Sequence, residues 1–325
     1  MVLWFMTNRS NAPSPQSTSF RFTGFDLSLY AVIIFAWSTS WYPLSLQVGV
    51  VAPEVSLTWR FAGASLLMFL FLIITKRQIR FSLANHARFA LLGILIFSTN
   101  FLVFYYAALQ GLASGLLSVI FSTASITSLI LSSILFRQRP DKRVALGGVI
   151  GLCGIALVFW PEISGTTFNH SALIGFLLGF CGVLCFSLGG IWSAKNQAAG
   201  LPLVSMNGWG MFYGMLWVAL ISVVRGQPFI IETTAIYLGS LVWLILLSTL
   251  LAFAVYLTLL GRIGAARAGY ATVIFPIIAL LISTVTEGYQ WTVLSLVGLI
   301  LVLVGNYFVL SRSKASKQQA PTNLP

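Results

Sequence analysis

The amino-acid sequence predicts an all-α integral membrane protein of ten transmembrane helices, arranged as two inverted five-helix repeats with both termini cytoplasmic. Hydrophobic residues make up 58% of the 325 residues and charged residues only 7%, whereas a soluble domain carries about 25% charged residues. Apolar segments of membrane-spanning length follow one another along the chain, and its two halves resemble each other at a nearly constant spacing. Lipid must cover this much apolar surface.

Ten stretches are long enough to cross a bilayer as helices, which takes about 20 mostly apolar residues. They are 26–46, 54–74, 88–107, 112–136, 144–160, 172–194, 204–224, 237–260, 267–286 and 291–311. The loops between them are short, so we expect consecutive helices to be antiparallel neighbours.

The polar segment 161–171 separates two halves that resemble each other. Matching features recur at separations of 150 to 152 residues: Trp41 and Trp192, Gly49 and Gly200, Trp59 and Trp209, 100–104 and 252–256, Gly147 and Gly298, and Gly154 and Gly305. So small a drift indicates a duplication. We therefore predict a disordered cytoplasmic N-terminus (1–25), a first five-helix repeat (26–160), an outer linker (161–171), a second five-helix repeat (172–311) and a cytoplasmic tail (312–325).

The distribution of lysine and arginine predicts the orientation, because these residues favour cytoplasmic loops. With a cytoplasmic N-terminus, 16 of the 18 basic residues fall on the inner side; Arg225 falls outside and Arg60 within a span. Since five is odd, the second repeat then enters the membrane from the opposite side. Inverted repeats with a site between them are the architecture of secondary transporters.

Composition also disfavours several classes of protein. The net charge of +12 is dispersed over short loops, whereas a nucleic-acid binder needs clustered basic residues. We expect Cys153, Cys181 and Cys185 to be buried small residues, and no metal, cofactor or enzymatic site is predicted. No acidic residue lies deep in a span, which argues against ion coupling through a carboxylate.

Arg60 is the one charged residue within a predicted span. It either reaches the headgroups or Glu54, or anchors an anionic substrate group or a gate. Trp37 and Trp41 are four residues apart and are expected to share a helix face, with Ser38 beside them. Trp41 and its counterpart Trp192 belong either to the aromatic belts or to cavity walls on opposite sides of a substrate.

Further candidate residues are polar or interrupt a helix. Asn100 must face another helix or a wet cavity, because an amide in lipid would lack hydrogen-bond partners. Ser118, Ser122 and Ser125 form a stripe that either packs helices or lines an aqueous path. Pro276 interrupts the ninth span and removes one helical hydrogen bond. Two tyrosines complete the set, Tyr256 and Tyr270.

The segment GAARAGYATVIFPIIALLIS (264–283), followed by Glu287 and the stretch from Gly298 to Gly305, resembles the EamA type of the drug/metabolite transporter superfamily. Residues 113–136 followed by Gly147 to Gly154 repeat the design, without the usual proline near Ser125 and with Arg137-Gln138 in place of Gly-Glu. The resemblance covers roughly residues 27–311. It implies export of small metabolites from bacteria, amino-acid exporters of the YddG kind being the nearest comparison.

We therefore predict a transporter of the bacterial inner membrane that exports amino acids or related small metabolites by alternating access. Its specificity should be broad and its transport independent of obligatory proton coupling. The predicted partners are a small-molecule substrate and membrane lipid, with no nucleic acid and no cofactor, and a monomer would suffice. The alternative is multidrug efflux of lipophilic cations, which typically needs a carboxylate within the membrane.

Overall fold

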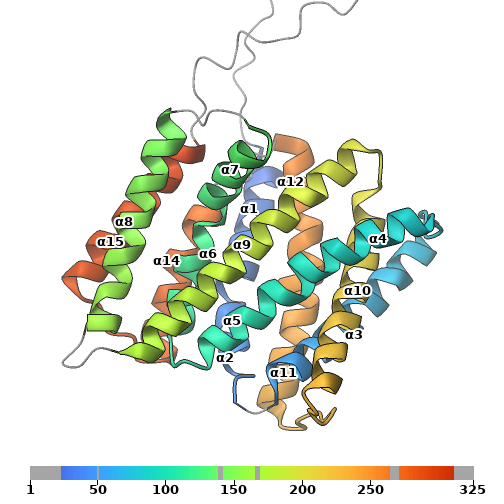
Figure 1. The fold of residues 1–325 in the computed structure, drawn as a ribbon, viewed down its shortest axis with the longest axis horizontal. Coiled ribbons are helices and arrows are strands. Elements are labelled where there is room, and N and C mark those ends of the chain that lie inside the picture. Colours follow the sequence, from blue (N-terminus) through green and yellow to red (C-terminus); the bar gives the residue numbers. More distant parts are fainter. Residues whose placement is uncertain (1–22, 50, 138–141, 165–168, 264–270, 311–325) are drawn as a thin grey trace, which may run out of the picture.

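The computed structural model describes residues 23–49, 51–137, 142–164, 169–263 and 271–310, which form helices and no strand (Figure 1). The prediction of an all-helical fold is therefore confirmed. The helices are α1 (Gly24–Ser38), α2 (Trp41–Ser45), α3 (Pro53–Ile74), α4 (Leu83–Leu92), η1 (Gly93–Thr99), α5 (Asn100–Ala108), α6 (Ser114–Ser122), α7 (Ala124–Leu135), α8 (Lys142–Ser164), α9 (His170–Ala198), α10 (Leu203–Val224), α11 (Ala235–Trp243), η2 (Leu244–Leu251), α12 (Ala252–Ile263), α14 (Ala271–Thr286) and α15 (Val293–Leu310).

Within these residues, nine helical segments are long and apolar enough to cross a membrane. They match nine of the ten predicted spans. The remaining predicted span is the ninth (267–286). Its helix α14 has 16 residues and follows a stretch, 264–270, outside the described part of the chain. The fifth span was predicted too short, because hydropathy detects only the apolar part of a helix. Its helix α8 runs through Pro161 to Ser164.

The first span is not one continuous helix. Its backbone departs from the α-helix at Thr39 and Ser40, between α1 and α2. The Thr39 hydroxyl donates to the Phe35 carbonyl (2.7 Å) and the Ser40 hydroxyl to the Ala36 carbonyl, and such bonds compete with the backbone ladder. Trp37 and Trp41, which we expect to share one helix face, therefore lie on either side of this break.

A break also divides the fourth span, which we predicted as a single stretch over 112–136. The chain turns at Thr123, between α6 and α7, although no proline is present. The Thr123 amide donates to the Ile120 carbonyl (3.1 Å), and the Thr123 hydroxyl donates to the same oxygen (2.6 Å). A buried threonine thus takes over the helix-breaking role that the usual proline would have.

Two spans contain π-helical segments at positions 151 residues apart. In η1, the Ser98 hydroxyl donates to the carbonyl five residues before it, that of Gly93 (3.0 Å). In η2, the Thr249 hydroxyl donates in the same way to Leu244 (2.8 Å). Short π segments are rare and often occur at functional sites. The residues around η1 and η2 are therefore candidates for a functional site.

Helices α8 and α15 lie side by side (Figure 1) and cross with their backbones in contact. A methyl group added to Gly147 would lie 2.7 Å from the Gly305 carbonyl oxygen, and one added to Gly154 would lie 2.6 Å from the Gly298 oxygen. The two helices run antiparallel. Gly147 therefore meets Gly305, the repeat counterpart of Gly154, and Gly154 meets Gly298, the repeat counterpart of Gly147. These glycines are therefore helix-packing positions.

The three cysteines do not all lie in the interior. Cys153 and Cys181 are exposed on the surface of the bundle, and Cys185 is partly exposed. The expectation of burial is therefore wrong for this group. In a membrane protein an apolar segment has apolar residues on its lipid-facing side as well, so composition does not separate surface from core.

Candidate functional site

Arg60 is the largest fully buried side chain of the described residues, with 1% of its surface exposed. It extends from α3 to η2, where Nε and Nη2 donate to the Thr249 hydroxyl oxygen at 3.4 and 3.1 Å. Nη2 also lies 3.3 Å from the Ser248 hydroxyl oxygen. Because Thr249 uses its own hydrogen within η2, its oxygen is available to accept these bonds.

The guanidinium of Arg60 has no carboxylate partner among the described residues. Its carbon lies 4.3 Å from the centre of the Phe101 ring and 5.4 Å from that of Phe61, so cation–π contacts replace part of its hydration. Nη1 is buried and makes no hydrogen bond. An uncompensated buried charge costs several kcal/mol, of order 5, so this arrangement suits a site that receives an anion.

A second unpaired donor lies beside the same cation. Gln47, which follows α2 and is fully buried, accepts a hydrogen bond from the Tyr105 hydroxyl (2.7 Å). Tyr105 lies one turn after Phe101, whose ring contacts the Arg60 guanidinium. The Gln47 amide nitrogen Nε2 makes no hydrogen bond. Arg60 and Gln47 thus flank one tyrosine, each with an N–H group to spare.

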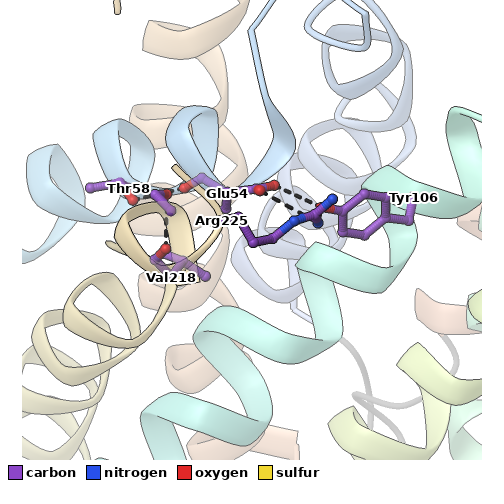
Figure 2. Close-up of polar contacts among 6 residues, drawn as sticks. Glu54, Thr58, Tyr106, Val218 and Arg225 are labelled. Carbon is purple, nitrogen blue, oxygen red and sulfur yellow. Dashed lines mark hydrogen bonds and ion pairs between the residues drawn. The ribbon is translucent and has the colours of Figure 1, made fainter. Parts of the chain in front are cut away.

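Glu54, Tyr106 and Arg225 form a second polar group, which we call the Glu54 latch (Figure 2). The Tyr106 hydroxyl donates to Glu54 Oε2 (2.8 Å), and Arg225 Nη1 lies 3.5 Å from Glu54 Oε1 and donates to the Tyr106 oxygen. Glu54 is 1% exposed, whereas Arg225 is 50% exposed. The latch joins the start of α3 to the ends of α5 and α10, and the carboxylate also suits the positive end of the α3 dipole.

The Glu287 carboxylate joins two distant parts of the chain. It lies at the same end of the bundle as the Glu54 latch, because its partner helix α6 begins only six residues after α5 ends. Glu287 Oε2 accepts hydrogen bonds from the backbone amide (2.9 Å) and the hydroxyl (2.7 Å) of Ser114, the first residue of α6. The Ser283 hydroxyl of α14 accepts from the Gly115 amide (2.7 Å). Glu287 and Ser283 thus accept hydrogen bonds from the Ser114 and Gly115 amides, which the start of a helix leaves unpaired.

Aromatic side chains from several helices touch in the interior. Trp41 lies 5.2 Å from Phe104 and 5.7 Å from Phe121 between ring centres, and Phe121 lies 6.2 Å from Phe275. Trp37 continues the series, 6.2 Å from Phe275 and 5.2 Å from Tyr256. We call these six residues the aromatic chain. It brings together three predicted site residues, Trp37, Trp41 and Tyr256.

Trp192 lies apart from the aromatic chain. Its indole nitrogen donates to the Arg88 carbonyl (3.0 Å), and the Lys195 ammonium lies 5.4 Å from the centre of its ring. The indole hydrogen bond ties the C-terminal part of α9 to α4.

Asn100, at the start of α5, is fully buried. Its neighbours one turn away, Ile96 and Phe104, touch Gly189 and Gly182 of α9. Its nitrogen donates to the Ile96 carbonyl (3.3 Å), whereas its oxygen Oδ1 is buried without a partner. Asn100 is therefore buried in the bundle with one acceptor unpaired.

The predicted serine stripe divides between two arrangements. Ser118 and Ser122 are buried and donate to carbonyls of their own helix, those of Gly115 (2.5 Å) and Val119 (2.7 Å). Ser125 instead lies 3.1 Å from the Thr272 hydroxyl of α14. Only Ser125 contacts another helix through its hydroxyl.

Three predicted residues remain. Ser38 is 1% exposed, and its hydroxyl has no hydrogen-bond partner. Pro276 is buried within α14, next to Phe275 of the aromatic chain. Tyr270 falls outside the described residues.

The sequence alone did not identify Gln47, Tyr105, Ser248 or Thr249 as site residues. All four are ordinary polar side chains in apolar stretches. Arg60 itself was the available signal, because a buried guanidinium requires acceptors. Its hydroxyl partners are 188 and 189 residues away along the chain, so local spacing could not indicate them.

The sequence profile of the EamA-like transporter family matches residues 26–160 and 173–311. The uncharacterized transporter YoaV of Bacillus subtilis (strain 168) is 24% identical over 87% of this chain and 96% of its own. Two relatives are named probable amino-acid metabolite efflux pumps. The one from Salmonella typhimurium is 25% identical and the one from Escherichia coli (strain K12) 22%, each over 66% of this chain and 73% of its own.

Among solved structures, one crystal structure superposes on this chain with a TM-score of 0.63 at 15% sequence identity. The match covers 88% of this chain and 96% of the other, which shows a shared fold. The family profile accounts for most of both halves of the sequence, and the nine apolar helices agree with the membrane location of such proteins. The chain belongs to the EamA-like transporter family and is a membrane transporter, not an enzyme.

Proposed function

We propose that this transporter exports amino acids or related small metabolites across the bacterial inner membrane by alternating access. The observation that carries the proposal is Arg60, a buried cation in the interior of the bundle that has no carboxylate partner in the part of the chain that the structure describes. It extends from α3 in the first half of the chain to η2 in the second. A site shared by two halves can be exposed to either side when they move against each other. The names of the two relatives from Salmonella typhimurium and Escherichia coli support amino-acid metabolites as the substrate class.

The inverted-repeat part of the proposal is supported by contacts that occur twice. The Trp59 indole donates to the Ile230 carbonyl (2.9 Å), and the Trp209 indole donates to the Ile79 carbonyl (3.0 Å). The two tryptophans are 150 residues apart and the two carbonyls 151. Each half therefore offers the other the same contact, as a two-fold axis between the halves requires.

The Glu54 latch supports a closed outer side. With a cytoplasmic N-terminus, the start of α3 and the ends of α5 and α10 lie at the outer end of the bundle. The latch and the Glu287–Ser114 contact then join the two halves there. We propose that both contacts separate when the transporter opens outward.

Transport by the purified full-length protein in liposomes tests the proposed function. We expect counterflow of radiolabelled amino acids of several side-chain types, because apolar contacts discriminate by only about 1–3 kcal/mol per methylene. Empty liposomes are the control. Uptake of tetraphenylphosphonium without uptake of any amino acid would contradict the proposal and favour multidrug efflux, for which the aromatic chain would provide cation–π contacts.

The same liposomes test ion coupling. Neither the six residues of the aromatic chain nor the Arg60 cluster, by which we mean Arg60, Gln47, Tyr105, Ser248 and Thr249, contains a carboxylate. We therefore expect no accumulation when a pH gradient is imposed without a substrate gradient. Uphill accumulation would identify an overlooked proton site, with Glu54 and Glu287 as the first residues to replace.

Reporter fusions test the orientation. A reporter after residue 80 should be cytoplasmic, and one after residue 165 should be outside, because the basic residues flank the first position and not the second. Finding both reporters in the same compartment would contradict the ten-helix inverted topology.

A further inference from the structure

We infer that Arg60 and Gln47 together bind a carboxylate group of the transported molecule. The inference rests on the proposed function and specifies the chemistry of its site. Arg60 Nη1 and Gln47 Nε2 are both buried donors without a hydrogen-bond partner. Tyr105 places them near each other, since it donates to Gln47 and lies one turn after Phe101, whose ring contacts the guanidinium. We place the carboxylate beside the Tyr105 hydroxyl, so that both unpaired N–H groups donate to it.

The missing acceptor should carry a negative charge. The hydroxyl oxygens of Ser248 and Thr249 accept hydrogen bonds from Arg60 but do not neutralise it. No carboxylate of the described residues pairs with this guanidinium, because Glu54, the nearest acid along α3, is bound by Arg225 and Tyr106. A bound carboxylate would supply the counter-charge in a geometry that the planar guanidinium matches.

The surroundings favour a monocarboxylate over a phosphate ester. Arg60 is the one cation of this cluster, and a phosphate dianion would leave one negative charge uncompensated. Phe61 and Phe101 lie against the guanidinium and suit an apolar side chain. No acidic residue of the cluster would bind an ammonium group. The site should therefore require the carboxylate of an amino acid more strictly than its ammonium.

Arg60 could instead serve only to join α3 to η2, and substrate analogues distinguish these roles. The probes are L-phenylalanine, 3-phenylpropionate, which lacks the ammonium, and L-phenylalaninamide, which lacks the carboxylate. Each is titrated against the purified full-length protein while its melting temperature is recorded. We expect both carboxylates to raise the melting temperature, and the amide to bind at least about tenfold more weakly, as the loss of one charged hydrogen bond implies.

Two variants at Gln47 test the site without touching the α3–η2 contact. Gln47→Glu places a carboxylate where the ligand should bind. It should raise the melting temperature without ligand and abolish the shift produced by 3-phenylpropionate. Gln47→Leu should weaken binding of both carboxylates several-fold. Gln78→Glu is the matched control, because Gln78 is exposed and its amide contacts only the Arg80 carbonyl (3.2 Å).

Arg60→Met should remove the discrimination between acid and amide. If it does not fold, the Gln47 variants decide the question. Equal binding of the acid and the amide by the wild-type protein would overturn the inference, as would an unchanged response of Gln47→Glu to 3-phenylpropionate. Since binding is measured without transport, carboxylate binding without any amino-acid flux would leave the inference intact and contradict the proposed function instead.

Discussion

Gly154→Ala is expected to abolish most of the folded transporter. The new methyl group would lie 2.6 Å from both the Gly298 oxygen and the Val302 nitrogen. These atoms belong to the backbone of α15, so no side-chain rotation relieves the contact and the two helices must separate. Overpacking of a core usually costs about 1–3 kcal/mol, and separation of two backbones should exceed this range.

The readout is the amount of monodisperse protein, measured by size-exclusion chromatography of a fluorescent fusion after mild detergent extraction. Gly239→Ala is the matched control, because a methyl group there meets nothing within 4 Å. Alanine is favoured over glycine in a helix by about 1 kcal/mol, so this control should be neutral or stabilising. Equal yields of the two variants would contradict the backbone contact between α8 and α15.

Gly151→Ala should give an intermediate result. Its methyl group would lie 2.5 Å from Ile126 Cδ1, which is the flexible end of a side chain. Gly298→Ala, by contrast, should be as damaging as Gly154→Ala, because its methyl group would lie 2.5 Å from the Gly154 oxygen. The order of the three yields therefore tests whether backbone contact, rather than the loss of a glycine, causes the defect.

Glu54→Gln is expected to open the outer side of the transporter. The substitution removes the ion pair with Arg225 while the amide oxygen can still accept the hydrogen bond from Tyr106. An ion pair with a half-exposed partner contributes up to about 1 kcal/mol, and the Tyr106 hydrogen bond also weakens when its acceptor loses its charge. The closed conformation should therefore lose several-fold in population relative to an outward-open one.

The measurement is the rate at which a membrane-impermeant maleimide labels Leu44→Cys from outside, in a background without the native cysteines. Leu44 is 3% exposed and lies in α2, so labelling requires opening. Arg225→Lys retains the positive charge and is the control, for which we expect a rate close to that of the parent. A lower melting temperature with unchanged labelling would mean that the latch only stabilises the fold.

The amino-acid sequence by itself determined the membrane class, nearly all of the spans and the family. These properties depend on apolar length and on the distribution of charge, both of which are local to a segment. Arg60 could be identified for the same reason, because a single charge within an apolar stretch is visible without any knowledge of its neighbours. The hydroxyl-rich breaks at Thr39–Ser40 and Thr123 were less accessible, since serine and threonine also occur within regular transmembrane helices.

Only the tertiary structure decided which side chains meet. Arg60 finds its acceptors in η2, and Glu54 finds Arg225 on a helix from the other half of the chain, 171 residues away. The tertiary structure also places Trp192 away from the aromatic chain and Gln47 next to Tyr105. Insertion into a membrane depends on each segment's transfer from water to lipid, whereas these contacts depend on how the inserted helices cross. Hydropathy determines which segments insert into the membrane and carries almost no information about which side chains meet afterwards.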